Sequence, residues 1–198
     1  MAQTPHVAPV YGLVLAGGKS SRMGLDKGLL EYHGIPQRDY LARLLDSVVP
    51  EVFMSLRADQ PYKGPVAVIT DRDEFRGPFN GLLSAHVMLP DVAWLVLACD
   101  MPLIDAEALE YLLKLRDAAA DATAFTLEQG GLPEPMAAIW EPHALARVPA
   151  YLQEVEGSCP RKFLIRSRTH LVVAQDPEIL ANANRPEEYQ TIQSRLAR

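Results

Sequence analysis

The residues with the clearest chemical potential lie near the start of the chain, in the stretch LAGGKSSRMGLDKGLL from Leu15 to Leu30. An apolar run ends there in two glycines, and three cations follow within nine residues: Lys19, Arg22 and Lys27. Glycines let backbone N–H groups approach a ligand closely, and arginine and lysine side chains neutralise phosphate charge. The stretch therefore predicts a loop that holds phosphate groups, although a tight turn with solvated charges would have the same composition.

Two common phosphate-binding motifs do not fit this stretch. A Walker-type P-loop needs G-x-x-x-x-G-K-[ST]; Gly18 is followed by Lys-Ser, but position 13 is Leu13 and Gly12 lies one residue too far upstream. The dinucleotide fingerprint G-x-G-x-x-G fails because Gly17, Gly18 and Gly24 have the wrong separation. The remaining interpretation is a loop that grips a nucleoside triphosphate in another way.

Short apolar runs alternate with amphipathic segments along the chain. The runs expected to form strands are Gly12–Leu15, Val52–Leu56, Val66–Ile69, Trp94–Ala98, Ala122–Leu127, Met136–Trp140 and Leu171–Val173. Helical spacing of apolar side chains occurs in Arg38–Val49 and in Ala106–Ala119, with Asp105 as the N-cap of the second helix. The alternation predicts an α/β fold of three layers, α/β/α, with a mainly parallel central sheet.

Ligands of open parallel sheets collect beyond the carboxyl ends of the strands, so the residues that follow each strand carry the most information. The glycine loop follows the first strand, Asp71 the third and Asp100 the fourth. Asp100 is the candidate metal ligand, because a carboxylate that ends a buried strand is costly without a cation nearby. Asp71 is a candidate for a nucleotide or metal-water contact. A turn or N-cap role remains the alternative for each.

The composition sets bounds on these functions. The chain has 198 residues and a net charge of −6, which predicts one domain over residues 10–198 after a short flexible tail at residues 1–9. The negative charge argues against general binding of nucleic acid but not against a nucleotide substrate. The sequence contains no apolar stretch of 18 residues. We therefore expect no membrane association and a cytoplasmic location.

Cysteine, histidine and serine residues indicate no second kind of site. Cys99 and Cys159 lie far apart, so they suggest neither a disulfide framework nor metal-ligand spacing. The five histidines fall outside the motifs and are expected at the surface or in packing. No serine lies in G-x-S-x-G, which argues against hydrolase chemistry.

The pattern L-A-G-G-x-S-S-R-M-G-x-D-K at residues 15–27 resembles the signature of the nucleotidyltransferases that attach a guanylyl group to molybdopterin. Three further segments resemble the same family: GPFNGLLSA at 77–85, WLVLACDMPLI at 94–104 and NANRPEEY at 182–189. In the last of these, Arg185 stands where threonine is usual. The resemblance spans nearly the whole chain and implies a Rossmann-like fold of the nucleotide-diphospho-sugar transferase type. The double glycine is similar to guanylyl-transferring rather than cytidylyl-transferring members.

The resemblance also implies an activity and its participants. The substrates would be GTP and molybdopterin, the cofactor Mg²⁺ and the products molybdopterin guanine dinucleotide and pyrophosphate. Carriers or acceptors of the molybdenum cofactor would be protein partners. The single domain at 10–198 would then be a nucleotidyltransferase domain.

Site residues follow from the same resemblance. The implied catalytic residues are Arg22, Lys27 and Asp100, with Asp100 as the metal ligand. The implied nucleotide-binding residues are Leu15, Ala16, Gly17, Gly18, Lys27, Asp71 and Asp100. The implied acceptor side comprises Glu134, Pro135, Asn182 and Asn184. One departure concerns Arg57, which stands in the region where some members carry an asparagine that contacts the nucleotide.

Two other functions stay open at this point. The same chemistry could use another base or acceptor, such as CTP with molybdopterin or a sugar phosphate, because base choice is usually set by backbone contacts. A module that binds a nucleotide or a partner without turnover is the second alternative. Arg22, Lys27 and Asp100 argue against such a module, since binding alone needs no metal carboxylate.

Overall fold

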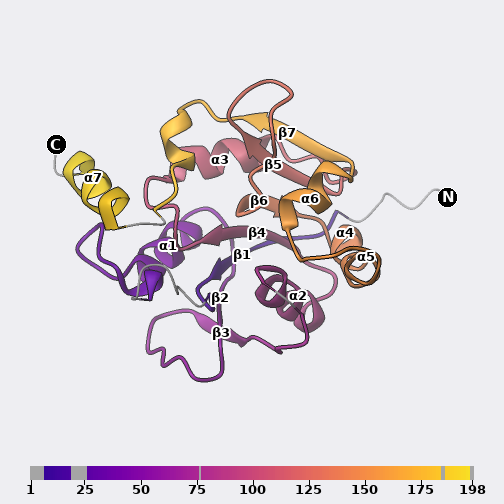
Figure 1. Ribbon diagram of the computed structural model, residues 1–198, viewed down its shortest axis with the longest axis horizontal. Helices are drawn as coiled ribbons and strands as arrows, with labels where there is room; N and C mark the ends of the chain where they lie inside the picture. Colours follow the sequence, from indigo (N-terminus) through magenta and orange to yellow (C-terminus); the bar gives the residue numbers. More distant parts are fainter. Residues whose placement is uncertain (1–6, 19–25, 76, 184–185, 197–198) are drawn as a thin grey trace.

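The computed structural model describes residues 7–18, 26–75, 77–183 and 186–196. Within them, seven strands form one sheet in the order β3-β2-β1-β4-β6-β5-β7. The strands are β1 (Val10–Leu15), β2 (Val52–Leu56), β3 (Ala67–Thr70), β4 (Ala93–Ala98), β5 (Ala122–Thr126), β6 (Ala137–Trp140) and β7 (Thr169–Val173). Figure 1 shows helices on both sides of this sheet, so the predicted three-layer α/β/α fold is confirmed.

Two sets of helices cover the two faces. One face packs against α1 (Gln37–Asp46), α3 (Ala106–Lys114) and the short helix η2 (Pro177–Leu180). The other face packs against α2 (Phe79–Met88), α4 (Pro142–Leu145), α5 (Val148–Glu154) and α6 (Pro160–Ile165). Two elements, η1 (Lys27–Leu29) and α7 (Pro186–Leu196), complete the described helices, and α7 lies on the α1 side in Figure 1.

Strand directions agree with the predicted, mainly parallel sheet. β1 lies between β2 and β4 and runs parallel to both, and β3 continues the parallel set beyond β2. β6 is the exception, because it pairs antiparallel with both β4 and β5. A direct connection can join β5 to an antiparallel β6, whereas parallel neighbours need a crossover. The carboxyl ends of β1 to β4 therefore meet at one edge of the sheet.

The middle of the sheet is apolar on both faces. Alternate residues of β4 enter different cores: Leu95 and Leu97 pack with α1 and α3, while Trp94 and Val96 pack with α2 and α4. All four side chains are fully buried. A strand that is apolar at every position is typical of a central strand covered on both faces, and the burial of β4 agrees with this.

Element boundaries differ from the sequence expectation by a few residues. α1 ends at Asp46 instead of Val49, and α3 ends at Lys114 instead of Ala119. Arg116 lies beyond the end of α3 and directs its guanidinium toward Glu141, which directly follows β6. The predicted N-cap of α3 is confirmed, because the Asp105 carboxylate accepts a hydrogen bond from the Ala108 N–H at 2.8 Å.

The segment that leads into β1 is attached to the sheet. The Ala8 carbonyl accepts a hydrogen bond from Arg116 Nη1 at 2.8 Å, and the Pro9 carbonyl accepts one from the Ala93 N–H at 2.9 Å. These two residues belong to the stretch that the sequence analysis assigns to a flexible tail. The first six residues of that stretch lie outside the described residues.

Arg116 and Glu141 form a bidentate ion pair at the end of β6, and we expect its loss to destabilise the fold. Both N–O distances are short, 2.7 and 2.8 Å, and the Glu141 side chain is only 2% exposed. Glu141→Ala should lower the free energy of unfolding by about 3 kcal/mol, because it leaves a buried guanidinium without its carboxylate. Urea titration measures this, with exposed Glu154→Ala as control. A loss as small as that of the control would contradict the expectation.

Candidate active site

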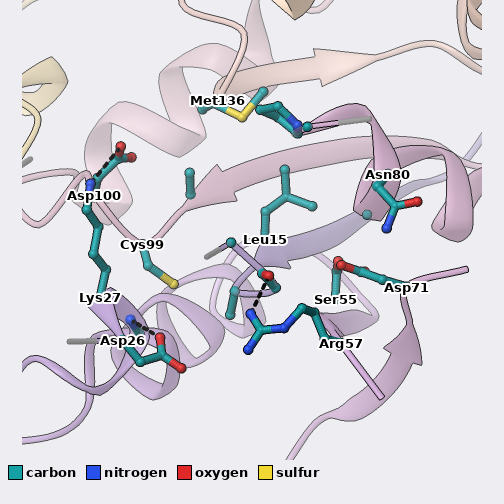
Figure 2. A pocket seen from close by; sticks show the side chains of 18 of the residues that line it. Leu15, Asp26, Lys27, Ser55, Arg57, Asp71, Asn80, Cys99, Asp100 and Met136 are labelled. Carbon is teal, nitrogen blue, oxygen red and sulfur yellow. Dashed lines mark hydrogen bonds and ion pairs between the residues drawn. The ribbon is translucent and has the colours of Figure 1, made fainter. Parts of the chain in front are cut away.

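A cavity of about 520 Å³ opens at the carboxyl ends of β1 to β4. Its walls come from the glycine loop after β1, the short helix η1, the ends of β2 and β4, the loop after β3 and the first turn of α2. In Figure 2, Asp100 and Lys27 lie at one end of the cavity, and Asp71 and Ser55 lie at the other. This is the crevice in which open parallel sheets bind ligands.

The structure brings together all seven residues assigned to nucleotide binding. They all line the cavity: Leu15, Ala16, Gly17, Gly18, Lys27, Asp71 and Asp100. Three candidate site residues, Lys19, Arg22 and Asn184, lie outside the described residues, as does Arg185.

Gly17 is required by the close approach of two loops. A Cβ atom at this position would overlap Asp71 Oδ2, so any other residue would displace the Asp71 carboxylate from its hydrogen bond with Ser55. At Gly18 no atom of a described residue lies within 4 Å of such a Cβ, and Gly18 lines the cavity. The first glycine is therefore structural, and the second leaves backbone accessible to a ligand.

Lys27 and Asp100 face one another at one end of the cavity (Figure 2), with Lys27 Nζ 3.7 Å from Asp100 Oδ2. Asp26 caps η1 by accepting a hydrogen bond from the Gly28 N–H at 2.9 Å, which holds the turn that carries Lys27. Burial raises the pKa of the Asp100 carboxyl, and the lysine ammonium partly offsets this rise. A cation beside Asp100 would favour the ionised carboxylate.

One oxygen of Asp100 has the character expected of a metal ligand. Asp100 Oδ1 is buried and accepts no hydrogen bond from any described residue. In the described ranges no three histidine, cysteine or acidic side chains cluster closely enough to hold a metal by themselves. Mg²⁺ is commonly bound by one or two carboxylates together with substrate phosphates and water, so the donor set fits a metal that arrives with a nucleotide.

Asp71 lies at the other end of the cavity in Figure 2. Its Oδ1 accepts a hydrogen bond from Ser55 Oγ at 2.6 Å, and its backbone N–H donates to the Leu56 carbonyl. Burial raises the pKa of the Asp71 carboxyl, the neighbouring Asp73 raises it further, and the Ser55 hydrogen bond and Arg57 lower it. Asp71 thus offers a hydrogen-bond acceptor to a ligand in the cavity.

The loop after β2 also reaches the site, through Arg57, noted above as standing where some relatives carry a nucleotide-contacting asparagine, and through Gln60, which was not among the predicted residues. Arg57 lines the cavity and donates from Nη1 to the Gly17 carbonyl at 2.7 Å. Gln60 donates to the Ala16 carbonyl at 3.0 Å. A signal was present, because both residues follow the carboxyl end of a predicted strand. Only the residues after the first, third and fourth predicted strands were predicted to face the site.

The residues assigned to the acceptor side are only partly placed near the cavity. Glu134 pairs with Arg161 at 2.7 Å, and the Pro135 carbonyl accepts from Trp140 Nε1. Neither residue lines the cavity, although the next residue, Met136, does. Asn182 is exposed, and the following residue donates its backbone N–H to the Asp100 carbonyl at 2.8 Å.

No helix within the described ranges is long and apolar enough to cross a membrane.

The fold is that of nucleotidyltransferases. A molybdopterin-guanine dinucleotide biosynthesis protein A from Archaeoglobus fulgidus matches with a TM-score of 0.74 at 20% identity, covering 94% of this chain and 98% of that one. A nucleotidyl transferase from Methanothermobacter thermautotroptrophicus matches with a TM-score of 0.73 at 17% identity, covering 96% and 98%. At these identities the likeness is one of fold, and it confirms the predicted fold class.

Sequence comparisons narrow the class to a family. The model of the MobA-like NTP transferase domain matches residues 12–189. A molybdenum cofactor guanylyltransferase of Pseudomonas putida is 32% identical over 187 residues, covering 92% of this chain and 96% of the relative. A molybdenum cofactor biosynthesis bifunctional protein of Synechocystis is 36% identical over 184 residues; the match covers 91% of this chain but only 53% of that protein. The chain belongs to the MobA-like NTP transferase family, as the sequence resemblance predicted.

Proposed function

We propose that this protein transfers GMP from GTP to molybdopterin, with Mg²⁺ as cofactor, and releases pyrophosphate. The observation that carries the proposal is one cavity in which the glycine loop, Lys27 and Asp100 meet at the strand ends. The family and the guanylyltransferases among its relatives supply the reaction class. Residues 10–198 would act as one nucleotidyltransferase domain. A cytoplasmic location and a protein that delivers or accepts the cofactor stay predictions.

The nucleotide would lie along the glycine loop. Gly18 leaves backbone accessible there, and Lys27 lies where its ammonium can neutralise charge on the triphosphate. Charge develops on the phosphate oxygens during transfer, so fixed cations lower the barrier more than they strengthen substrate binding. The proposal assigns Arg22 to the same task, and this residue lies outside the described ranges. Asp71 would accept a hydrogen bond from the nucleotide at the other end of the cavity.

Asp100 would hold Mg²⁺ through its buried Oδ1, with the remaining ligands supplied by phosphate oxygens and water. The bound metal would make the α-phosphate more electrophilic and would stabilise the pyrophosphate that leaves. Lys27, 3.7 Å from the other carboxylate oxygen, keeps Asp100 oriented and favours its ionised form. These two residues therefore act as a unit.

The acceptor needs no general base from this chain if it presents a phosphomonoester. The second pKa of such a phosphate is about 6, so its oxygen is already anionic near neutral pH. None of the four histidines in the described part of the chain lines the cavity. The acceptor side remains a proposal for Glu134, Pro135, Asn182 and Asn184. Two neighbouring residues support it: Met136 lines the cavity, and the Ala183 N–H donates to the Asp100 carbonyl.

A thermal-shift panel tests the base and the metal together. GTP, CTP, ATP and UTP are each added with and without Mg²⁺, and we expect GTP with Mg²⁺ to raise the unfolding temperature most. At 100 times Kd, binding stabilises the folded state by about 2.7 kcal/mol, a shift of roughly 5–10 °C for a chain of this size. A shift selective for CTP would contradict the proposed guanylyl transfer and favour cytidylyl transfer. The absence of any nucleotide-dependent shift would contradict the proposal.

Turnover is then measured as pyrophosphate released from GTP in the presence of molybdopterin. Release that depends on both substrates and on Mg²⁺ is the expected result. Binding of GTP without release would favour the alternative of a module that binds a nucleotide without catalysis.

A further inference from the structure

We infer that Gln60 is a positioning residue that ties together the two ends of the nucleotide loop, and this inference rests on the proposed function. Gln60 lies in the loop after β2, far in sequence from residues 16–26. Its side chain nevertheless contacts both Ala16, at the start of that stretch, and Asp26, at its end. The residues of the 15–27 motif do not by themselves predict this contact, because Gln60 lies outside the motif.

The Gln60 amide uses each of its hydrogen-bonding groups on a different partner. Nε2 donates to the Ala16 carbonyl at 3.0 Å and to Asp26 Oδ2 at 2.9 Å. Oε1 accepts from the backbone N–H of Arg57 at 3.0 Å. Since a backbone N–H can only donate, and a carbonyl and a carboxylate accept, these partners determine which way the amide faces. A glutamate at this position would direct a carboxylate oxygen at two acceptors.

The two residues that Gln60 contacts, Asp26 and Ala16, lie next to the parts of the loop proposed to bind the nucleotide. Asp26 uses its other oxygen, Oδ1, to accept from the Gly28 N–H at 2.9 Å, which forms the turn of Lys27. On the other side, the Ala16 carbonyl belongs to the loop that continues into the glycines. Arg57, whose N–H orients Gln60, donates its Nη1 to the next carbonyl, that of Gly17, at 2.7 Å.

Such a link affects binding more than folding. Joining the ends of a loop before a ligand arrives reduces the conformational entropy that binding must remove. It also holds Lys27 in a fixed position relative to the backbone groups of the glycine loop. A triphosphate that contacts Lys27 and these backbone groups at the same time therefore binds more tightly. Gln60 is a half-buried loop residue that holds its neighbours by hydrogen bonds, so its replacement should change the apolar packing between the sheet and the helices little.

The test is Gln60→Glu, with titration calorimetry for the Kd of GTP with Mg²⁺ and a separate measurement of the unfolding temperature without ligand. We expect Kd to rise about tenfold, because GTP must then order the two ends of the stretch when it binds. The unfolding temperature should fall by no more than roughly 5 °C, since water can replace the hydrogen bonds of this half-buried side chain. Gln60→Met, neutral and of similar length, should raise Kd in the same direction. Gln153→Glu places the same charge on the exposed face of α5 and should leave Kd unchanged.

A compensating variant sharpens the test. Asp26→Asn in the Gln60→Glu background replaces two facing carboxylates by an amide that can donate to Glu, and asparagine is still a good N-cap. We expect this double variant to bind GTP more tightly than Gln60→Glu alone. Asp26→Asn by itself places the asparagine NH₂ group against the NH₂ group of Gln60, so the hydrogen bond between the two side chains is lost and GTP binding should weaken. Asp26→Asn would thus weaken GTP binding in the wild-type background and strengthen it in the Gln60→Glu background. If Asp26 and Gln60 acted separately, the substitution would change Kd in the same direction in both.

Three outcomes would overturn the inference or its basis. Wild-type Kd in folded Gln60→Glu and Gln60→Met overturns the positioning role. So does a fall in unfolding temperature with unchanged Kd, since a purely structural residue would behave in that way. If the wild-type protein itself binds no nucleotide, the proposed function fails, and the inference fails with it.

Discussion

Asp100→Asn should reduce nucleotidyl transfer by about 10³-fold or more while the protein stays folded. The substitution preserves the shape of the side chain but removes the only charge that Asp100 offers to a metal. Its buried Oδ1, which accepts no hydrogen bond from a described residue, would lose its ligand role. Pyrophosphate release at saturating GTP, acceptor and Mg²⁺ measures the effect, which should appear mainly in kcat.

The stability of the same variant separates loss of chemistry from loss of fold. The folded-state pKa of Asp100 is raised by burial, so its ionisation disfavours the folded state as the pH rises past the unfolded-state value. Asparagine removes this penalty near neutral pH. The ligand-free variant should therefore unfold at a temperature no lower than that of the wild-type protein, and its advantage should disappear as the pH falls below the ordinary range of aspartate.

Glu110→Gln serves as the matched control, because Glu110 lies on the exposed face of α3 and loses the same charge. It should retain wild-type turnover. Near-normal turnover in folded Asp100→Asn would remove Asp100 from the mechanism. A large fall in the unfolding temperature of Asp100→Asn would instead show that its charge supports the fold, contrary to the direction of its pKa shift.

Lys27→Met should lower kcat/KM by about 10²- to 10³-fold, the range for removing one group that stabilises developing charge. Methionine approximates the length of lysine without its ammonium. The fall in kcat/KM therefore measures the removal of the charge more than a change in packing. Asp100 would lose its cationic neighbour, and the pKa of its carboxyl should rise further. Turnover in Lys27→Met should therefore shift toward higher pH, and a pH profile of kcat/KM detects the shift.

Lys27→Arg distinguishes position from charge. Arginine keeps the charge but spreads it over a planar group, so at a site built for a compact ammonium it should restore only part of the rate. Lys114→Met, at the exposed end of α3, is the control and should leave kcat/KM unchanged. If Lys27→Met retained at least half of the wild-type kcat/KM, Lys27 would have no role in the chemistry.

Local patterns in the chain were enough to predict the architecture. Apolar runs of strand length, separated by segments with helical spacing, predicted all seven strands, the mainly parallel sheet and its layers of helices. The Asp105 cap was predictable for the same reason, since a cap depends on residues next to one another in sequence. Helix ends were less predictable because α1 and α3 stop where their apolar pattern continues for a few more residues.

The ends of the strands identified most of the cavity, and the sequence resemblance identified the family. Lys27, Asp71 and Asp100 line one cavity because parallel strands bring their carboxyl ends to the same edge. Their assigned roles remain proposals. Glu134 and Pro135 show where this reasoning stops. Because β6 runs antiparallel, its amino end, which follows Glu134 and Pro135, lies at the same edge of the sheet as the carboxyl end of β4. The Glu134 side chain nevertheless pairs with Arg161 and does not line the cavity.

The sequence by itself determined the fold class, the family and the glycine loop that we propose holds the nucleotide, because these depend on short patterns. Only the tertiary structure decided which loops lie against that loop. The order β3-β2-β1 places the residues after β2 beside the residues after β1, and Gln60 there bonds to Ala16 and to Asp26 across more than thirty positions of sequence. Such contacts depend on strand order and register, which no local pattern contains.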